Sequence, residues 1–518
     1  MSSIATISTV SVGSVNYYLP QTTGDLSLLI SDAITNKKKI SMRGAGHSFP
    51  LTTDMESGNF GDHTSCTYIL MSYFNSVSFD DATMQVTVGG GCHLGLDPYD
   101  PTPESTGVKS TDANSFFTQV FKHGWAIPEM GGIKHQTIGG FISTGSSGGS
   151  LKYSFDEMLQ SITIMTAEAT PQLRTFSIND PDKDNFYAAG IALGMFGIIV
   201  SATFSCVTNF NISGSETTSY VKDCPIDLFN ASPTDLQHYF ETTDYARLIW
   251  WPQENVQKMV IWEASQIPTS SGFVPNPYQE VPSIFGSETP ANAVGDLIYS
   301  AIGGFPDWLL DMFKNSTIGK VVAAVLDTAF YPIILPFILD VFVKVGEDQK
   351  FQDYWYSGLC MDNEMSDKLM PVHFTEIWIP MSQAPGVMTA LQNFYGDQGQ
   401  NTQNTGYFST EIYGAKANKF WMSPSYGNDM IRVDVFWFAN TNKDPVQTLF
   451  QNYWNELEPF NFRCHWGKYL PQTINGKSGS AYLLSQYPNF TKWNAIRQSL
   501  DPNGIFVTPY WETQLGLS

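Results

Sequence analysis

The chain has 518 residues, enough for two or three domains that each enclose a core of their own. Its 42% hydrophobic and 15% charged residues describe a globular protein and exclude a disordered one. The formal net charge of −22 opposes binding to nucleic acids and to anionic membranes, because it would repel their phosphates.

The six cysteines stand singly, without a CxxC pair or a cysteine–histidine cluster at zinc spacing, so no structural metal is expected. The N-terminal stretch MSSIATISTVSVGSV lacks the basic start and apolar core of a secretory signal. The apolar stretch 321–343 is interrupted by acidic residues and prolines, which predicts buried helices and no membrane span. A soluble protein is expected; a cytoplasmic and a secreted location both stay open, as does the oligomeric state.

The first predicted elements lead into a glycine-rich turn. Apolar residues spaced three and four apart predict a helix over 24–37, and KKKISM predicts a strand that enters the turn RGAGHSF at 43–49. Gly44 and Gly46 allow positive φ and a close approach to a ligand, and the amides of such a turn can bind phosphate oxygens. The turn suits a dinucleotide cofactor and presents His47, although a lone histidine in a glycine turn is more often a hydrogen-bonding residue of the turn itself.

A second glycine segment follows strands predicted over 68–74 and 84–91 and a helix over 115–124. This segment, GGIKHQTIGGFISTGSSGGS at 131–150, has seven glycines, a density that neither a helix nor a strand needs for its stability. Neither glycine segment has the GxGxxG turn with a following helix and acid, or the GxxxxGK[ST] phosphate loop. Two such segments near strand ends nevertheless predict a cofactor with an extended pyrophosphate.

The chain changes character near residue 208. Before this boundary, strands are predicted over 159–169, 173–178 and 197–207 and a helix over 185–196. After it the sequence is rich in aromatic residues, and antiparallel strands are predicted within 247–264, 373–380 and 430–440. An apolar insert at 296–345 predicts helices that complete a core or an oligomer interface, or else line a tunnel for a bulky apolar alcohol.

Four motifs resemble, in this order, those of the FAD-linked oxidases of the p-cresol methylhydroxylase type, the vanillyl-alcohol oxidase family. They are RGAGHSF, GGIKHQTIGGFISTGSSGG, NFYAAGIALGMFGIIVSATF and, near the C-terminus, LDPNGIF. The resemblance runs nearly from end to end and implies an α+β protein with the two-domain FAD-binding fold of that family and an antiparallel-sheet cap domain for the substrate. By the same resemblance, 1–208 form the FAD-binding domain, 209–468 form the cap domain, and 469–518 return to the FAD-binding domain.

The resemblance also implies which residues bind FAD. The histidine of the first turn is covalently joined to the flavin in many members, and this assigns the attachment to His47. A second link through a cysteine of the second glycine segment is not expected, because this chain has none there. The implied cofactor-binding residues are Arg43, Gly44, Ala45, Gly46, His47, Ser48 and Phe49 of the first turn, Gly132, Thr137, Gly139, Gly140, Ser143, Thr144, Gly145 and Ser147 of the second segment, and Gly197 and Ile199.

Three further motifs resemble the alditol and aldonolactone oxidase branch of the family: HWGK at 465–468, TEIWIP at 375–380 and TEIYGAKANKFWMSPSYG at 410–427. The match implies that Glu411 and Lys468 lie at the reactive face of the flavin, and it makes Glu376 and His465 further catalytic candidates. Two candidate positions depart from the pattern. Tyr413 stands where the family has an arginine, and Asp434 stands where alditol oxidases have a histidine, so the substrate assignment is in doubt.

Oxidation of a CH–OH group requires an acceptor for the hydroxyl proton and an acceptor for the hydride. The implied flavin takes the hydride, Glu411 orients or deprotonates the hydroxyl, and Lys468 stabilises the anionic reduced ring. The expected activity is FAD-dependent oxidation of a polyol, sugar or lactone with reduction of oxygen to hydrogen peroxide. The alternatives are an enzyme of the same fold for a hydrophobic, sterol-like alcohol or a secondary metabolite, or one that uses another electron acceptor, and a non-catalytic flavin-binding protein.

Each candidate also has an ordinary structural interpretation. Glu411 and Glu376 could be strand-end carboxylates with solvated heads, and His465 could be a histidine packed beside Trp466. By default, Lys468 would be a surface lysine. The HWGK motif favours the functional interpretation of Lys468, whereas both interpretations stay open for Glu411, Glu376 and His465.

Overall fold

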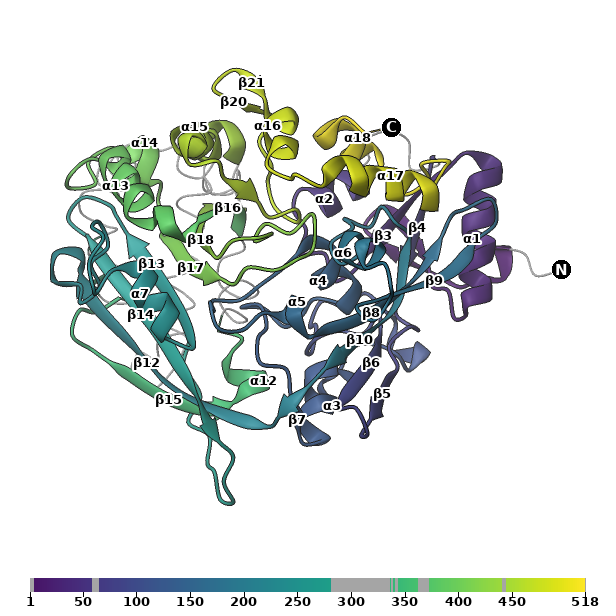
Figure 1. Ribbon diagram of the computed structural model, residues 1–518, viewed down its shortest axis with the longest axis horizontal. Helices are drawn as coiled ribbons and strands as arrows, with labels where there is room; N and C mark the ends of the chain where they lie inside the picture. The colour runs from purple at the N-terminus through teal and green to yellow at the C-terminus, as the bar shows by residue number, and fades with distance from the viewer. Residues whose placement is uncertain are drawn as a thin grey trace, which may run out of the picture.

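The computed structural model describes residues 4–57, 65–280, 336, 339–340, 343–361, 372–439 and 444–517. These residues form two lobes side by side, one built on the purple and blue N-terminal part of the chain and the other on the teal and green middle part (Figure 1). The yellow C-terminal helices return to the first lobe. Each lobe combines its own sheets with separate helices, which confirms the expected α+β class.

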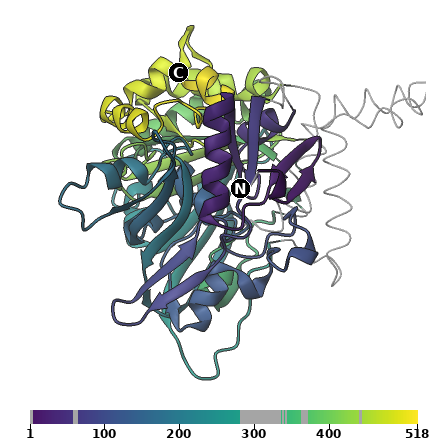
Figure 2. The same cartoon turned by 90° about the vertical axis from the view of Figure 1, so that its right-hand side faces the viewer.

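The N-terminal sheet of the first lobe has the strand order β1-β2-β4-β3. Its strands are Thr9–Val12 (β1), Val15–Tyr18 (β2), Cys66–Leu70 (β4) and Lys39–Arg43 (β3). Helix α1 (Thr23–Asn36) connects β2 to β3, and β2, β3 and β4 run parallel. A capping box of Thr22 and Asp25 begins the helix, and its apolar side is buried in this lobe. In Figure 2 this purple helix stands upright on the side that faces the viewer. The sheet thereby fixes where β3 ends and the first glycine turn begins.

The second sheet of this lobe is antiparallel, in the order β5-β6-β10-β8-β9. Its strands are Val77–Asp80 (β5), Gln85–Gly89 (β6), Ile198–Ser205 (β10), Leu159–Thr166 (β8) and Gln172–Ser177 (β9). The backbones approach closely at the end of β6, because a Cβ on Gly90 would lie 2.1 Å from the carbonyl oxygen of Ile199. The chain beyond β6 therefore needs glycine at this position.

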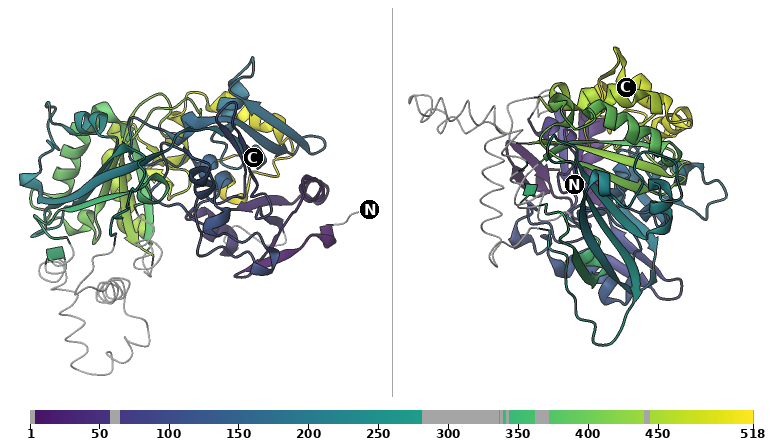
Figure 3. Two further views of the ribbon diagram at one scale, coloured as in Figure 1. Left: turned by 90° about the horizontal axis from the view of Figure 1, so that it is seen from below. Right: turned by 90° about the vertical axis from the view of Figure 1, so that its left-hand side faces the viewer.

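The second lobe is an antiparallel sheet of eight strands in the order β15-β12-β14-β13-β17-β18-β16-β19, and we call it the cap sheet. Its strands are Gln349–Tyr354, Phe210–Tyr220, Lys258–Pro268, Tyr245–Trp251, Thr410–Ala415, Met430–Phe438, Val372–Pro380 and Arg463–Cys464, in that order. Helices α7 (Leu236–Thr242), α13 (Ala384–Tyr395) and α15 (Gln451–Leu457) belong to this lobe (Figure 3). The sheet meets the first lobe at β13, where the amide of Ala246 donates to the carbonyl of Gly149 (2.8 Å).

Shorter elements connect these sheets. The helices are α2 (Leu51–Ser57), α3 (Phe116–Lys122), α4 (Ile138–Thr144), α5 (Phe155–Met158), α6 (Asp184–Ala189), α12 (Trp355–Gly358), α14 (Thr402–Thr405), α16 (Gly479–Ser485), α17 (Phe490–Leu500) and α18 (Pro509–Leu515). The paired short strands are β7 (Trp125–Ala126) with β11 (Val207–Thr208), and β20 (Thr473–Ile474) with β21 (Lys477–Ser478). Single turns of 3-10 or π helix lie at Ile4–Thr6, Glu104–Thr106, Asp112–Asn114, Val221–Asp223, Met381–Gln383, Val446–Phe450 and Glu458–Phe460.

The C-terminal motif LDPNGIF ties the end of the chain to the first lobe. Asp501 accepts hydrogen bonds from the amides of Ile505 (3.0 Å) and Phe506 (2.8 Å), which closes the turn after α17. The carbonyl of Ile505 then accepts from the amide of Ile40 in β3 (2.7 Å). The motif thus supports the strand that leads into the first glycine turn.

The strands predicted around both glycine segments are confirmed, but the extent of one predicted helix needs correction. The helix expected over 185–196 ends at Ala189 in α6, because Leu193 (φ 56°) and Gly194 (φ 73°) adopt left-handed backbone. The second glycine segment contains helix α4, whose end is set by Gly145 at φ 72°.

The apolar insert predicted at 296–345 lies outside the described residues except for 336, 339–340 and 343–345. Within the described part of the chain, no helix combines the length and the apolar character needed to cross a membrane.

Candidate active site

The two glycine segments lie against each other. A Cβ on Gly44 would be 2.5 Å from Oγ1 of Thr137, so glycine is what lets the first turn contact the second segment. Gly46 adopts φ 86°, which favours glycine for a second reason. The remaining residues of the turn, Ala45, His47, Ser48 and Phe49, are half-buried. The structure therefore joins the two motifs that the sequence places about ninety residues apart.

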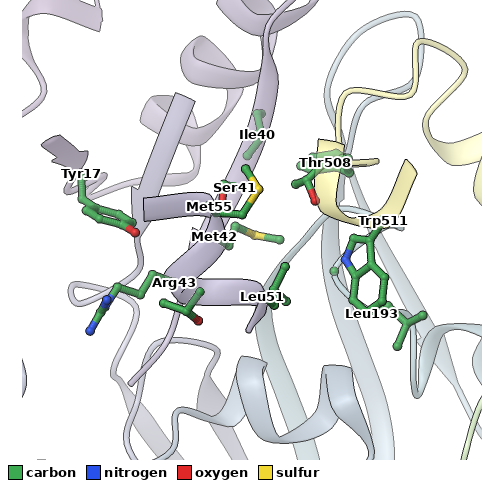
Figure 4. Close-up of a pocket in the computed structure, with 13 residues that line it drawn as sticks. Tyr17, Ile40, Ser41, Met42, Arg43, Leu51, Met55, Leu193, Thr508 and Trp511 are labelled. Carbon is green, nitrogen blue, oxygen red and sulfur yellow. The ribbon is translucent and has the colours of Figure 1, made fainter. Parts of the chain in front are cut away.

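Arg43, a predicted cofactor-binding residue, is the last residue of β3 and leads directly into this turn. Its guanidinium forms an ion pair with Glu56, and the hydroxyl of Tyr17 donates to the same carboxylate (2.8 Å). Arg43 and Tyr17 border a hollow between β3, α2 and α18 that Met55 and Trp511 also line (Figure 4). The side chain of Arg43 thus has a structural role in the described protein, and its backbone carries the start of the turn.

The second segment is shaped by its own caps. Oγ1 of Thr137 accepts from the amide of Gly140 (3.3 Å) at the start of α4. A Cβ on Gly139 would lie 3.0 Å from the carbonyl oxygen of Gly90, and Thr144 donates from Oγ1 to the carbonyl of Gly140 (3.1 Å). The other predicted residues of this region are Gly132 and Ser143, both half-buried, Gly197 at φ 134°, and the buried Ile199 on β10. The segment therefore presents backbone instead of bulky side chains to the first turn.

Lys468 connects the HWGK motif to the first turn. Its Nζ donates to the carbonyl oxygen of His47 (3.2 Å) and lies 3.7 Å from the ring centroid of Phe374. Burial lowers the pKa of Lys468 to about 8, so the amine can change charge in the mildly alkaline range. Lys468 is therefore not a surface lysine, and it lies at the junction of the two lobes.

His465 bridges the lobes a few residues earlier. Its Nε2 is 3.1 Å from Oγ of Ser146 in the second glycine segment, and its Nδ1 accepts from the amide of Gly467 (3.1 Å). Burial lowers the pKa of His465 to about 4, which keeps the imidazole neutral at physiological pH. The side chain is thus a fixed hydrogen-bonding group between lobes as well as a neighbour of Trp466.

Three carboxyl groups lie in one row across the cap sheet. In the strand register, Asp434 of β18 is directly opposite Glu411 of β17 on one side and Glu376 of β16 on the other. Directly opposed residues of neighbouring strands project to the same face, so the three groups are neighbours. We call them the carboxyl row. The structure therefore brings together three acidic residues that the sequence predicted separately as catalytic candidates.

The members of the carboxyl row have different protonation tendencies. Burial raises the pKa of Asp434 well above its ordinary value, and the negative charges of Glu376 and Glu411 add to the effect despite the nearby Arg432. Burial would also raise the pKa of Glu376, but the positive charges of Arg432 and Lys468 hold it below its ordinary value. The row therefore contains one carboxyl that keeps its proton beside one that readily gives it up.

Arg432 is the main residue of the site that the sequence analysis missed. In the register of the cap sheet it lies opposite Tyr413 on one side and Trp378 on the other, and its guanidinium is 4.6 Å and 4.8 Å from the two ring centroids. Its Nη2 contacts carboxylate oxygens of Asp434 (2.7 Å) and Glu376 (3.3 Å). The signal was present in MIRVDVFWF, where Arg432 alternates with Asp434 on a strand that is otherwise apolar at its centre.

Tyr413 and Glu411 form a pair next to this arginine. The hydroxyl of Tyr413 donates to Oε2 of Glu411 (2.9 Å). The tyrosine that departs from the family pattern thus orients the carboxylate two residues before it and stacks on the arginine of the neighbouring strand. Tyr413 is only 4% exposed, while Glu411 is half-buried and more accessible than the rest of the row.

Glu129 is a second residue that the sequence analysis missed. It is 1% exposed and accepts hydrogen bonds from the amides of Gly148 and Phe155, the second at 2.9 Å. Burial raises its pKa to about 8. Glu129 thereby fixes the backbone at the end of the second glycine segment.

The chemistry available at this junction is that of a proton and charge relay. A buried lysine can neutralise negative charge, a neutral imidazole can hold a hydroxyl, and the carboxyl row offers both a proton acceptor and a proton donor. Within the described residues, no group of three or more metal-binding side chains gathers at a common point. The arrangement fits oxidation of an alcohol beside an organic cofactor.

Comparison with known proteins agrees with this chemistry. The sequence matches the family described as D-arabinono-1,4-lactone oxidase over residues 202–514. L-gulonolactone oxidase from Mus musculus is 23% identical over 504 residues, which cover 96% of this chain and 94% of that protein. A putative D-arabinono-1,4-lactone oxidase from Neurospora crassa is 21% identical over 523 residues, covering 95% of this chain and 82% of that protein.

Solved structures resemble the chain over almost its whole length. Cholesterol oxidase from Brevibacterium sterolicum has a TM-score of 0.67 at 15% identity and covers 97% of this chain and 94% of its own. A solvent-stable cholesterol oxidase has a TM-score of 0.63 at 17% identity, with 97% and 95% covered. At these identities the likeness concerns the fold alone, and it confirms the FAD-binding fold of the p-cresol methylhydroxylase type that the motifs implied.

Proposed function

The chain belongs to the D-arabinono-1,4-lactone oxidase family, and we propose that it oxidises a ring CH–OH group of an aldonolactone and passes the electrons through FAD to oxygen. As a member of this oxidase family, the protein is an FAD-linked oxidoreductase. The proposed substrate class follows the names of its relatives, L-gulonolactone oxidase and D-arabinono-1,4-lactone oxidase. The proposed products are the oxidised lactone and hydrogen peroxide.

One observation carries the proposal. Lys468 contacts the backbone of His47 in the first glycine turn, and the same end of the cap sheet carries the carboxyl row. A cofactor held by the first turn would therefore have a titratable cation and proton-accepting carboxylates beside it. These are the groups that hydride abstraction from an alcohol requires.

The residues of the first lobe fit FAD. Gly44 lies against the side chain of Thr137, so the two glycine segments are neighbours, and the amides of such glycine-rich turns can bind phosphate oxygens. We propose that the first turn, the second segment and the Gly197–Ile199 region hold the cofactor, and that His47 is its covalent attachment point. FAD would supply the hydride acceptor that no side chain can provide.

The domain assignment belongs to the same proposal. Residues 1–208 and 469–518 would bind the cofactor, and 209–468 would cover the substrate. The observed path of the chain supports this division, because the C-terminal motif contacts β3 of the first lobe while the strands after residue 208 build the cap sheet.

The roles of individual residues follow from their surroundings. Glu411 is the most accessible carboxylate of the row and would accept the proton of the substrate hydroxyl, with Tyr413 holding its other oxygen. Lys468 would neutralise the negative charge that develops when hydride leaves the substrate. His465 and Asp434 would act as neutral hydrogen-bonding groups, and Glu376 would balance the charge of Arg432.

A polyhydroxylated substrate also suits the polarity of this face. The carboxyl row and the buried cations of the cap sheet can form hydrogen bonds with the hydroxyl groups of such a substrate. A sterol-like alcohol would leave these polar groups unpaired. The cap sheet therefore gives no support to the hydrophobic-alcohol alternative.

The proposal is tested by mixing the FAD-loaded enzyme with candidate substrates. Anaerobic bleaching of the flavin by L-gulono-1,4-lactone or D-arabinono-1,4-lactone, followed by peroxide release when oxygen is admitted, is expected. Cholesterol and benzyl alcohol serve as controls that should leave the flavin oxidised. Bleaching by the apolar alcohols and not by the lactones would overturn the proposed substrate class.

A further inference from the structure

If all three carboxyls of the row were ionised, the row would hold more negative charge than a buried surface can bear without compensation. Neighbouring strands lie about 4.8 Å apart, so three ionised carboxylates in successive strands would repel one another strongly at low dielectric. Arg432 is only 5% exposed and contacts two of the three, Asp434 and Glu376. Its guanidinium is therefore placed to decide which members of the row are charged.

The guanidinium is also fixed in its orientation. The rings of Tyr413 and Trp378, on the two flanking strands, lie 4.6 Å and 4.8 Å from the guanidinium carbon, and the indole nitrogen of Trp378 donates to Glu376 (3.3 Å). A planar cation between two aromatic rings cannot rotate freely, so its hydrogen bonds point in set directions. Lysine could supply the charge at this position but could not reproduce the planar stacking.

The remaining hydrogen bond of Arg432 crosses to the first lobe. Nη1 donates to the carbonyl oxygen of Ser147 in the second glycine segment (2.7 Å). The next residue, Gly148, donates its amide to the buried carboxyl of Glu129. The end of the glycine segment is thus held between Glu129 of its own lobe and Arg432 of the cap sheet.

We propose that Arg432 is a positioning residue that sets the charge of the carboxyl row and locks this row to the second glycine segment. In this role Arg432 supplies, from β18, the buried cation that Tyr413 does not supply from the opposite position on β17. The role in catalysis rests on the proposed function, whereas the charge-setting role does not.

Several groups face Glu376, and each bears on its protonation. They are Trp378 on its own strand, Arg432 and Asp434 on β18, and Cys464, His465 and Lys468 on or just after β19, while Glu411 lies beyond Asp434 on β17. Arg432 is the cation among them that forms an ion pair with Glu376 at 3.3 Å. Removing this charge should therefore raise the pKa of Glu376, and Lys468 should be too distant to replace the ion pair.

A residue swap tests the proposal. Arg432→Tyr removes the cation, and the double variant Tyr413→Arg/Arg432→Tyr returns it one strand away in the same cross-strand pair. Position 413 also faces the second glycine segment, because a Cβ on Gly149 would lie 3.0 Å from Cδ1 of Tyr413. We expect the single variant to lower the rate of flavin reduction by lactone about 100-fold and the double variant to recover at least tenfold of this loss.

A second readout does not depend on the substrate. In FAD-loaded Arg432→Met, we expect Glu376 to keep its proton in the folded state, whereas it loses the proton in the unfolded state. The variant should therefore lose stability relative to the wild type as pH rises from about 5 to about 8. Arg463→Met, which removes a buried arginine of the same sheet that donates to the backbone carbonyls of Gln486, Pro424 and Tyr426, is the matched control and should keep the wild-type pH dependence of the melting temperature. If lactones fail to reduce the wild-type flavin but this shift is seen, the proposed function is wrong and the charge-setting role stands.

Two outcomes would overturn the inference. One is an Arg432→Met holoenzyme whose melting temperature follows pH as in the wild type. The other is a double variant that folds, binds FAD and reduces its flavin no faster than Arg432→Tyr.

Discussion

Nζ of Lys468 donates a hydrogen bond to the carbonyl oxygen of His47 across the junction of the two lobes, 3.2 Å away. The two residues are 421 positions apart in the sequence. The contact fixes a cation on one side of the first glycine turn, and the nearby ring of Phe374 limits where the amine can move. The geometry makes Lys468 the first residue to test.

Lys468→Met should lower the rate of anaerobic flavin reduction by lactone about 10²-fold or more, because the negative charge of the reduced cofactor would lose its neutralising partner. Stopped-flow absorbance of the FAD-loaded enzyme measures this rate. Lys468→Arg keeps the charge and should retain a larger share of the rate. Equal rates in the wild type and Lys468→Met would remove Lys468 from the mechanism.

The same residue should produce an alkaline limb in the pH profile. The pKa of Lys468 is lowered to about 8 by burial, so the amine is charged below this pH and neutral above it. If the charged form assists hydride transfer, flavin reduction should slow as pH rises through about 8. Lys468→Arg should abolish this limb, since the guanidinium does not titrate in the range. A limb that persists in the arginine variant would belong to another group.

The parts of this site that could be predicted from the sequence are those that depend on residues close together in the chain. His47, Gly44 and Gly46 are readable because a glycine turn is a local pattern with a local cause. The contact of Gly44 with Thr137 depends on two loops meeting in space, and the sequence contains no measure of that distance. The motifs predicted that both segments bind the cofactor, but only the fold shows that the two segments lie against each other.

Arg432 illustrates the limit more sharply. Position 413 departs from the family pattern because it lacks the expected arginine. That β17 and β18 pair with Tyr413 opposite Arg432 cannot be read from the sequence, because strand register depends on the packing of the whole cap sheet. Glu129 was missed for a similar reason, since its partners Gly148 and Phe155 lie nineteen and twenty-six residues further along the chain.

His47→Asn should abolish covalent attachment of FAD if His47 is the attachment residue. Wild-type protein separated on a denaturing gel should fluoresce under ultraviolet light, and the variant should not. His123→Asn is a suitable control, because His123 lies away from the site and stacks on Phe79. Fluorescence that survives in His47→Asn would show that another residue forms the link, and no fluorescence in the wild type would exclude a covalent link.

Gly44→Val should weaken FAD binding at least tenfold. Even the Cβ atom of the new side chain would lie only 2.5 Å from Oγ1 of Thr137. The two glycine segments would therefore have to separate to make room for valine. Gly24→Ala in α1 is the control, because its Cβ would only reach ordinary contact with Thr22 (3.4 Å). Titration of the apoprotein with FAD, followed by flavin fluorescence, measures both affinities. Unchanged affinity in Gly44→Val would place the cofactor elsewhere.

Glu411→Gln should lower flavin reduction more than Tyr413→Phe does, because the first removes the proposed proton acceptor and the second removes only the hydrogen bond that orients it (2.9 Å). We expect about a 100-fold loss for Glu411→Gln and about a tenfold loss for Tyr413→Phe. Single-turnover reduction by lactone at saturating concentration separates these effects from changes in binding. The opposite order would assign the proton to a different acceptor.

His465 should make the protein sensitive to acid. Burial lowers its pKa to about 4 in the folded state, whereas an unfolded chain binds the proton near the ordinary value of 6.5. Between these two values the unfolded state holds more protons than the folded state, so stability falls as pH decreases from about 6.5 to about 4. The shift corresponds to about 3 kcal/mol of unfolding free energy at the acid end of this window. His465→Asn keeps a polar side chain near Ser146 but cannot titrate, and its unfolding free energy should therefore decline less with acid than that of the wild type. Urea unfolding at pH values across the window measures the difference, and parallel declines in the two proteins would show that His465 is not the group responsible.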